Sequence, residues 1–318
     1  MISPMSILVV IAMYGIWSSM FSLAKIALQY SPPFFLTGAR MAIAGLILLG
    51  YLFLTKRSSF KISRSQWLSI GFLAFFSIYL TNVLEFWALQ YLSAAKACFI
   101  YSLSPFFAAF FSYLHFNEKI NLRKAVGLSI GFLGIIPVLL LQTGGEELLN
   151  AFSFFSWPSL AMVGAALCSV YGWVLLRLIV KDQMISPVMA NGSSMMIGGI
   201  MAFAHSFFAE AWHPIPVMAT NLVPFFGWIV LMAFISNIIC TNLYTLMLRR
   251  FTVTFLSFIG LLSPIFASLH GWLFLGEPLS LMIFLSTGVV CLGLWVVYAA
   301  ELKQGYIIKS SPQPAVTT

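Results

Sequence analysis

The chain has 318 residues, of which 61% are hydrophobic and only 8% are charged, and its mean hydropathy is +1.00. A soluble domain typically carries about 25% charged residues, so this composition excludes a soluble globular protein. The formal net charge of +8 does not indicate a nucleic-acid-binding protein, because the basic residues lie in short loops between apolar runs.

The apolar runs are long enough to cross a bilayer as helices and too long for the strands of a barrel. The first begins at Met5 and exceeds the core of a signal peptide, so we expect a membrane span and no cleaved leader. The sequence predicts an all-α polytopic membrane protein with about ten transmembrane helices. In chain order, the expected spans are 5–29, 34–54, 67–90, 92–116, 124–142, 157–180, 185–208, 223–247, 253–275 and 280–300.

Basic residues are concentrated in every second loop between these spans. The opposite loops contain Glu146, Glu147, Glu210 and Glu277 and no Lys or Arg. By the positive-inside rule, this pattern predicts a multi-pass protein of a bacterial inner membrane with both termini in the cytoplasm. The basic residues on the predicted cytoplasmic side are Lys56, Arg57, Lys61, Arg64, Lys119, Arg123, Lys124, Arg177, Lys181, Arg249, Arg250, Lys303 and Lys309.

The chain also contains an internal repeat, in which Pro105 aligns with Pro264 at an offset of 159 residues. Apolar matches between helices arise by chance, whereas Ser-Pro and Glu matches at one fixed offset are more specific. The polar matches are Ser104/Ser263 and Glu118/Glu277, and a Thr-Asn pair precedes each copy, Thr81-Asn82 and Thr241-Asn242, with a shift of one residue.

Each half holds five expected spans, and an odd number places the start of the second half on the other side of the membrane. The sequence therefore predicts two inverted five-helix repeats, a pattern that many transporters share. We expect the first repeat at 1–142, an external connecting loop at 143–156, the second repeat at 157–300 and a cytoplasmic tail at 301–318.

The motifs resemble those of the drug/metabolite transporter superfamily, in particular its EamA-type members, over about residues 7–300. The second copy of the repeat ends in the usual Gly276-Glu277-Pro278, whereas the first has Asn117 where Gly is common. The resemblance implies ten helices and secondary transport, and it does not identify the substrate. A narrower resemblance, of a compact chain with 31 Phe, is to S-adenosylmethionine carriers of obligate intracellular bacteria. The opening helix pair carries the family pattern at Tyr14-Gly15, Trp17, Lys25, Pro32-Pro33 and Arg40.

Four charged residues lie inside the apolar runs, namely Lys25, Arg40, Glu85 and Lys96. Charges at membrane depth are costly and tend to mark function. All four are expected ~6–9 Å below the outer boundary, where three positive charges and one negative charge suit a substrate carboxylate or phosphate. Glu85 and Lys96 are expected to face each other across a tight turn. The alternative is that Lys25 and Lys96 snorkel outward and Glu85 simply pairs with one of them.

Four aromatic residues, Trp17, Tyr101, Tyr171 and Trp173, lie near the middle of their spans, although Trp and Tyr normally prefer the membrane interfaces. We expect them to wall a substrate cavity, with helix packing as the alternative. Pro105 and Pro264 lie within spans, where they free backbone carbonyls and allow a bend, and are therefore gating candidates.

The sequence indicates a secondary transporter of a small polar or zwitterionic metabolite that works by alternating access. The four cysteines have no CxxC spacing and the histidines are scattered, so no metal site and no cofactor is expected. Open alternatives are an exporter of amino acids or drugs and, in another class, a lipid-modifying membrane enzyme. The enzyme is disfavoured because Glu85 is the only acid well inside a span. A homodimer remains one open assembly state.

Overall fold

A computed structural model describes residues 4–92, 94–143, 156–182, 185–212, 215–217, 221–275 and 281–306, and within these ranges the chain is helical without strands. Within the described residues, eight continuous helical stretches, some made of two or more consecutive helices, are long and apolar enough to cross a membrane, and a shorter apolar stretch covers Val253–Ala267. The expected all-helical membrane class is confirmed. The predictions that concern Glu146, Glu147, Glu277 and Lys309 fall outside the described residues.

Several expected spans consist of two shorter helices or end in a π-helical turn. Segments Ala74–Leu80, Leu178–Asp182 and Ala233–Cys240 are π-helical, and Arg57–Phe60 and Gly260–Leu262 are 3-10 turns. The α-helices are α1 (Pro4–Trp17), α2 (Met20–Ala27), α3 (Pro33–Thr55), α4 (Arg64–Leu73), α5 (Thr81–Leu89), α6 (Ala94–Tyr101), α7 (Ser104–Phe116), α8 (Leu122–Thr143), α10 (Trp157–Arg177), α11 (Pro187–Ala209), α12 (Leu222–Met232), α13 (Thr241–Met247), α14 (Val253–Ile259), α15 (Ser263–Leu275) and α16 (Leu281–Lys303).

Local sequence signals explain where several helices begin and end. Ser63 and Gln66 form a capping box at the start of α4, and the Ser186 side chain accepts a hydrogen bond from the backbone of Met189 at the start of α11. α7 ends at Asn117, which adopts the left-handed conformation with a φ of 54°. Asn is one of the residues that tolerates this conformation, so its replacement of the usual Gly preserves the turn.

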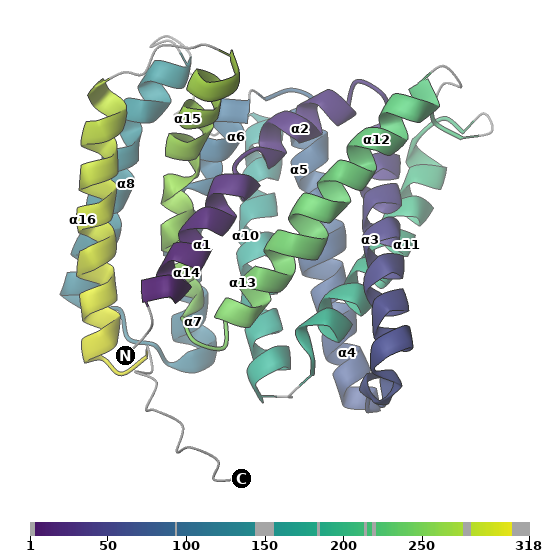
Figure 1. The fold of residues 1–318 in the computed structure, drawn as a ribbon, viewed down its shortest axis with the longest axis horizontal. Coiled ribbons are helices and arrows are strands. Elements are labelled where there is room, and N and C mark those ends of the chain that lie inside the picture. The colour runs from purple at the N-terminus through teal and green to yellow at the C-terminus, as the bar shows by residue number, and fades with distance from the viewer. Residues whose placement is uncertain are drawn as a thin grey trace.

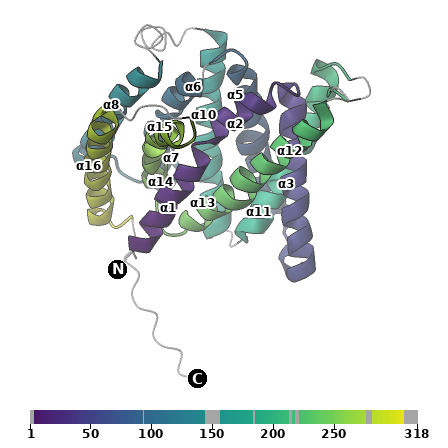
Figure 2. The ribbon, with the colours of Figure 1, turned by 45° about the horizontal axis from the view of Figure 1, so that its top comes forward.

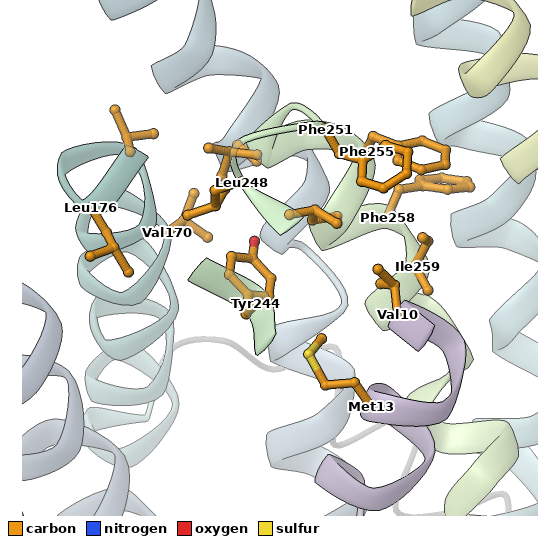
Figure 3. Close-up of a cluster of buried hydrophobic side chains, with 14 of the residues drawn as sticks. Val10, Met13, Val170, Leu176, Tyr244, Leu248, Phe251, Phe255, Phe258 and Ile259 are labelled. Carbon is orange, nitrogen blue, oxygen red and sulfur yellow. The ribbon is translucent and has the colours of Figure 1, made fainter. Parts of the chain in front are cut away.

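Two closely packed helix pairs form opposite edges of the molecule (Figure 1). α8 packs along α16 at one edge, and α3 packs along α11 at the other, with the remaining helices between them in both views (Figure 2). α3 and α11 run antiparallel, since Gly38 approaches Phe203 while Gly45 approaches Met196. The buried core between the edges includes Tyr244 of α13, which lies among apolar side chains such as Met13 of α1 (Figure 3).

Glycines allow the backbones of α3 and α11 to approach closely. A Cβ atom at Gly45 would lie 2.8 Å from the Met196 nitrogen and 3.0 Å from the Gly192 carbonyl oxygen, and neither backbone atom can move aside. A Cβ atom at Gly199 would meet the Ala42 nitrogen at 2.9 Å in the same way. Small residues permit such tight crossings in membranes, where helix packing depends on van der Waals contact.

This packing predicts opposite effects for two substitutions in one helix. Gly45→Ala should lower the stability of the purified protein by about 1–3 kcal/mol, because the added methyl group overpacks the crossing. Gly50→Ala should be neutral or stabilising by up to about 1 kcal/mol, because no atom lies within 4 Å of its Cβ position and Ala favours the helix. Thermal unfolding in one detergent measures both, and equal effects of the two substitutions would contradict the proposed crossing.

The two Thr-Asn pairs follow π-helical segments that match in structure as well as in sequence. Thr81 Oγ1 donates to the Phe76 carbonyl at 2.8 Å, and Thr241 Oγ1 donates to the Ser236 carbonyl at 2.8 Å. The Asn82 and Asn242 side chains likewise donate to carbonyls four residues earlier, at 2.7 and 2.9 Å. The side chains therefore satisfy carbonyl groups that the wide turns release.

The Ser-Pro pairs also mark matching breaks. α6 ends at Tyr101 and α7 begins at Ser104, while α14 ends at Ile259 and α15 begins at Ser263. Pro105 and Pro264 thus lie in the first turn of a new helix, where the missing N–H group has no helical acceptor to lose. The prediction of mid-helix prolines is corrected in this respect, because each expected span is interrupted just before its proline.

Candidate functional site

A cavity of about 200 Å³ lies between the helices of both halves of the chain. Its wall is formed mainly by α1, α2, α3, α5, α6, α10, α11, α14 and the π-helical segments Ala74–Leu80 and Ala233–Cys240. Among the described residues that line it, Arg40 and Glu85 are the charged ones. The other polar groups in the cavity wall are hydroxyl and amide groups, and the apolar part of the wall consists largely of aromatic and Met side chains. Concave sites of this mixed character bind small molecules.

Arg40 is held at the cavity wall by α3 and has only 4% of its surface exposed. Its Nη2 atom donates a hydrogen bond to Asn82 Oδ1, and its guanidinium lies 4.7 Å from the centre of the Phe86 ring. The Nε atom is buried and has no hydrogen-bond partner among the described residues. A buried donor that is left unpaired costs free energy, and an anionic group in the cavity would supply the missing acceptor.

Glu85 faces the same cavity from α5. Its carboxylate accepts a hydrogen bond from the Tyr101 hydroxyl at 2.6 Å. Glu85 and Arg40 therefore form an acidic and a basic group at one wall, which suits a zwitterionic ligand. The expected contact between Glu85 and Lys96 falls outside the described part of the structure, which does not include the Lys96 side chain.

Aromatic rings form another part of the wall. The Trp17 indole donates to Ser236 Oγ at 3.1 Å, which fixes the ring beside the π-helical segment Ala233–Cys240. Trp173 meets Trp17 edge-on at 5.8 Å between ring centres and lies 4.2 Å from the ring of Tyr244. Tyr244 is 1% exposed and contacts both Trp rings from the core. Figure 3 shows Tyr244 among the apolar side chains of that core.

The structure brings five of the eight predicted binding residues to one cavity: Trp17, Arg40, Glu85, Tyr101 and Trp173. Tyr171 lies instead against Phe76, Phe111 and His115, because it is two positions from Trp173 and points to a different side of α10. Lys25 lines a separate hollow together with Leu28 and Gln90. The described side chains at the cavity therefore carry one positive and one negative charge, and not the expected surplus of positive charge.

Polar residues outside the predicted binding set also line the cavity. Asn82, which the sequence marks as part of the repeat, accepts a hydrogen bond from Arg40 and lines the cavity as well. Asn191 and Asn237 were not identified in advance, because a neutral amide inside a span is more often a packing residue. The matching spacing of Asn237 and Ser77 before the two Thr-Asn pairs is the sequence signal that could have indicated them.

Two ion pairs are buried at the end of the molecule that carries the basic loops. Lys124 Nζ lies 2.7 Å from Glu301 Oε1, both side chains are fully buried, and Thr252 donates to the other Glu301 oxygen at 2.5 Å. Arg177 Nη1 lies 2.6 Å from Glu118 Oε1. Lys124 and Arg177 were expected as loop charges. This description is corrected, because Glu301 of α16 and Glu118, which follows α7, pair with them inside the protein.

A helical membrane protein with a charged and aromatic cavity among its spans has the architecture of a solute transporter. The family model of the EamA-like transporter family matches residues 4–140 and 156–299, and the chain belongs to this family. A solved crystal structure has a TM-score of 0.70 with 17% identity, covering 93% of this chain and 97% of the other, which supports the fold.

Two relatives are transporters with a named substrate. A Chlamydia muridarum protein is 42% identical over 310 residues, covering 97% of this chain and 96% of the relative, and is an S-adenosylmethionine/S-adenosylhomocysteine transporter. A Chlamydia trachomatis protein of the same description is 41% identical over 296 residues, covering 93% and 89%. The family and these relatives are transporters and not enzymes, so the lipid-modifying alternative is not favoured.

Proposed function

We propose that this chain carries S-adenosylmethionine and S-adenosylhomocysteine across a bacterial inner membrane by alternating access. The observation that carries the proposal is that Arg40, Glu85 and several aromatic rings line one cavity. Both metabolites have an amino-acid end with a carboxylate and an ammonium group, and both have a planar purine. The site offers a group of matching chemistry to each part.

The amino-acid end is proposed to lie at the charged wall. The carboxylate would accept from Arg40 Nε, which has no partner in the described structure, and the ammonium group would pair with Glu85. The purine would stack against Trp17 or Trp173, and aromatic faces also attract the sulfonium of S-adenosylmethionine. Lys25, Lys96 and Tyr171 remain candidates for the path to the site and not for its centre.

We also propose the ten-span arrangement with inverted repeats at 1–142 and 157–300. Antiparallel packing of α3 and α11 supports it, because Gly38 and Gly45 correspond to Gly192 and Gly199 at one offset of 154 residues. The matching π-helical segments and helix breaks support the same relation. Two equivalent halves around a central cavity could exchange roles, with Pro105 and Pro264 at the points where each half can bend.

Transport into proteoliposomes tests the function directly. Radiolabelled S-adenosylmethionine should accumulate in vesicles that contain the protein, and unlabelled S-adenosylhomocysteine should compete. Methionine and adenosine separately should compete poorly, since each satisfies only one part of the site. Absence of uptake in either direction, with protein shown to be folded and inserted, would contradict the proposal. Light scattering of the same preparation tests the homodimer.

Both termini are proposed to face the cytoplasm. In a variant without native cysteines, Ser59→Cys between α3 and α4 should be protected from a membrane-impermeant maleimide in intact cells. Glu146→Cys, in the loop predicted to be external, should react. After permeabilisation both should react. Labelling of Ser59→Cys in intact cells would reverse the proposed orientation.

A further inference from the structure

A cavity-lining residue in the second half of the chain, Asn237, has a buried amide oxygen that no described group donates to. Asn237 lies on the π-helical segment Ala233–Cys240 and is 3% exposed. Its amide nitrogen lies 3.2 Å from the sulfur of Met41, and its Oδ1 atom is buried without a hydrogen-bond partner in the described part of the chain. Asn237 lines the cavity. A buried acceptor of this kind is costly unless a ligand donates to it.

The neighbouring polar groups do not compete for this acceptor. The Asn191 amide donates to Asn242 Oδ1 and to Thr245 Oγ1, both at 3.0 Å, so these three side chains satisfy one another. The counterpart of Asn237 before the first Thr-Asn pair is Ser77, which is shorter. The second half therefore presents a neutral acceptor to the cavity, whereas the first half presents Arg40 and Glu85.

The aromatic wall lies next to this acceptor. The Trp17 indole is bonded to Ser236, the residue that directly precedes Asn237. A ligand that places a planar ring against Trp17 can therefore direct an in-plane N–H group toward Asn237 Oδ1. From these contacts we infer that Asn237 recognises the exocyclic amine of the purine and fixes the substrate with its nucleoside toward the second half of the chain.

This inference rests on the proposed function and makes Asn237 a specificity determinant. The ammonium group of the substrate is already matched to Glu85. On the purine ring, the exocyclic amine is the group that donates hydrogen bonds, whereas the ring nitrogens accept them. Amino acids without a purine cannot satisfy Asn237. The cavity thus distinguishes S-adenosyl compounds from free amino acids, which lack the purine. In the reversed orientation, with the purine at the charged wall, both Asn237 Oδ1 and Arg40 Nε would stay unpaired.

Equilibrium binding of two ligands to the purified full-length protein tests the inference. The first is S-adenosylhomocysteine, and the second is its 6-deamino analogue, in which hydrogen replaces the exocyclic amine. The wild-type protein should bind the first about 10-fold more tightly, because the analogue leaves the buried acceptor unpaired. Asn237→Ala should reduce this ratio to about 1, mainly by weakening S-adenosylhomocysteine.

Ser194→Ala is the matched control, because Ser194 lines the same cavity and its hydroxyl is already bonded to the Asn191 carbonyl. It should keep the wild-type ratio. Asn237→Asp, which retains an acceptor, should keep a preference for the amine if Asn237→Ala fails to fold. An unchanged ratio in folded Asn237→Ala, or a wild-type ratio of 1, would overturn the inference. Failure of wild-type protein to bind S-adenosylhomocysteine would instead refute the proposed function.

Discussion

Arg40→Met should lower the initial rate of S-adenosylmethionine uptake into proteoliposomes by about 100-fold or more. Removing one member of a buried charged and hydrogen-bonded group typically costs about 2–5 kcal/mol in binding. Here the substitution removes the proposed carboxylate partner, frees Asn82 Oδ1 and leaves Glu85 with Tyr101 as its neutral partner. Arg40→Lys should retain the charge but lose the forked geometry, giving an intermediate rate.

A double substitution separates substrate contact from simple charge balance. If Arg40 only balances Glu85, Arg40→Met combined with Glu85→Gln should recover most of the rate that either single variant loses. If both residues contact substrate, as proposed, the double variant should remain inactive while reaching the membrane at wild-type levels. Uptake near the wild-type rate in both single variants would rule out a role for this pair.

Lys124→Met should destabilise the folded protein by about 3–5 kcal/mol, the largest stability effect expected in the chain. The substitution keeps an unbranched side chain of similar length and removes the ion pair. The Glu301 carboxylate then stays buried with the Thr252 hydroxyl as its one hydrogen-bond donor among the described residues. Thermal unfolding in detergent, followed by size-exclusion chromatography, measures the loss. The double variant with Lys124→Met and Glu301→Gln should recover most of it, because no unpaired charge then remains buried at this position.

Lys61→Met provides a control for the loss of a positive charge near the same face, because Lys61 lies in the exposed loop before α4 and forms no ion pair in the described structure. Its stability should change by less than about 0.5 kcal/mol. Equal melting temperatures for Lys124→Met and Lys61→Met would show that the buried pair contributes nothing, and a double variant no better than the single one would place the effect outside the pair.

The sequence predicts the helical membrane class because chain length and charge content leave few alternatives. It also predicts Arg40 and Glu85 as binding-site candidates, because a charge inside an apolar run is rare enough to be informative by itself. Tyr171 and Trp173 could not be separated, since the side that each faces depends on helix rotation and on packing partners. Lys124 and Arg177 were assigned to loops because their partners, Glu301 and Glu118, lie far away in the sequence.

The π-helical turns could not be predicted from the sequence alone. The Thr-Asn pairs fit ordinary helices equally well, and only the observed bonds to carbonyls four and five residues earlier show their role. The Thr-Asn pairs are offset by 160 residues and the Ser-Pro pairs by 159, so this one-residue difference lies after the π-helical segments, between the two pairs. Asn237 depends on the same wide turns, which is why its position at the cavity was not predicted.

The balance of Arg40 and Glu85 has an electrical consequence. Among the described lining residues these are the charged ones, and their charges cancel, so the loaded cavity carries the charge of its cargo. S-adenosylmethionine has one net positive charge at neutral pH, and S-adenosylhomocysteine has none. A membrane potential therefore acts on the first and not on the second, by about 2.3 kcal/mol per 100 mV. An interior-negative cell would draw in the methyl donor while the spent product left without electrical work.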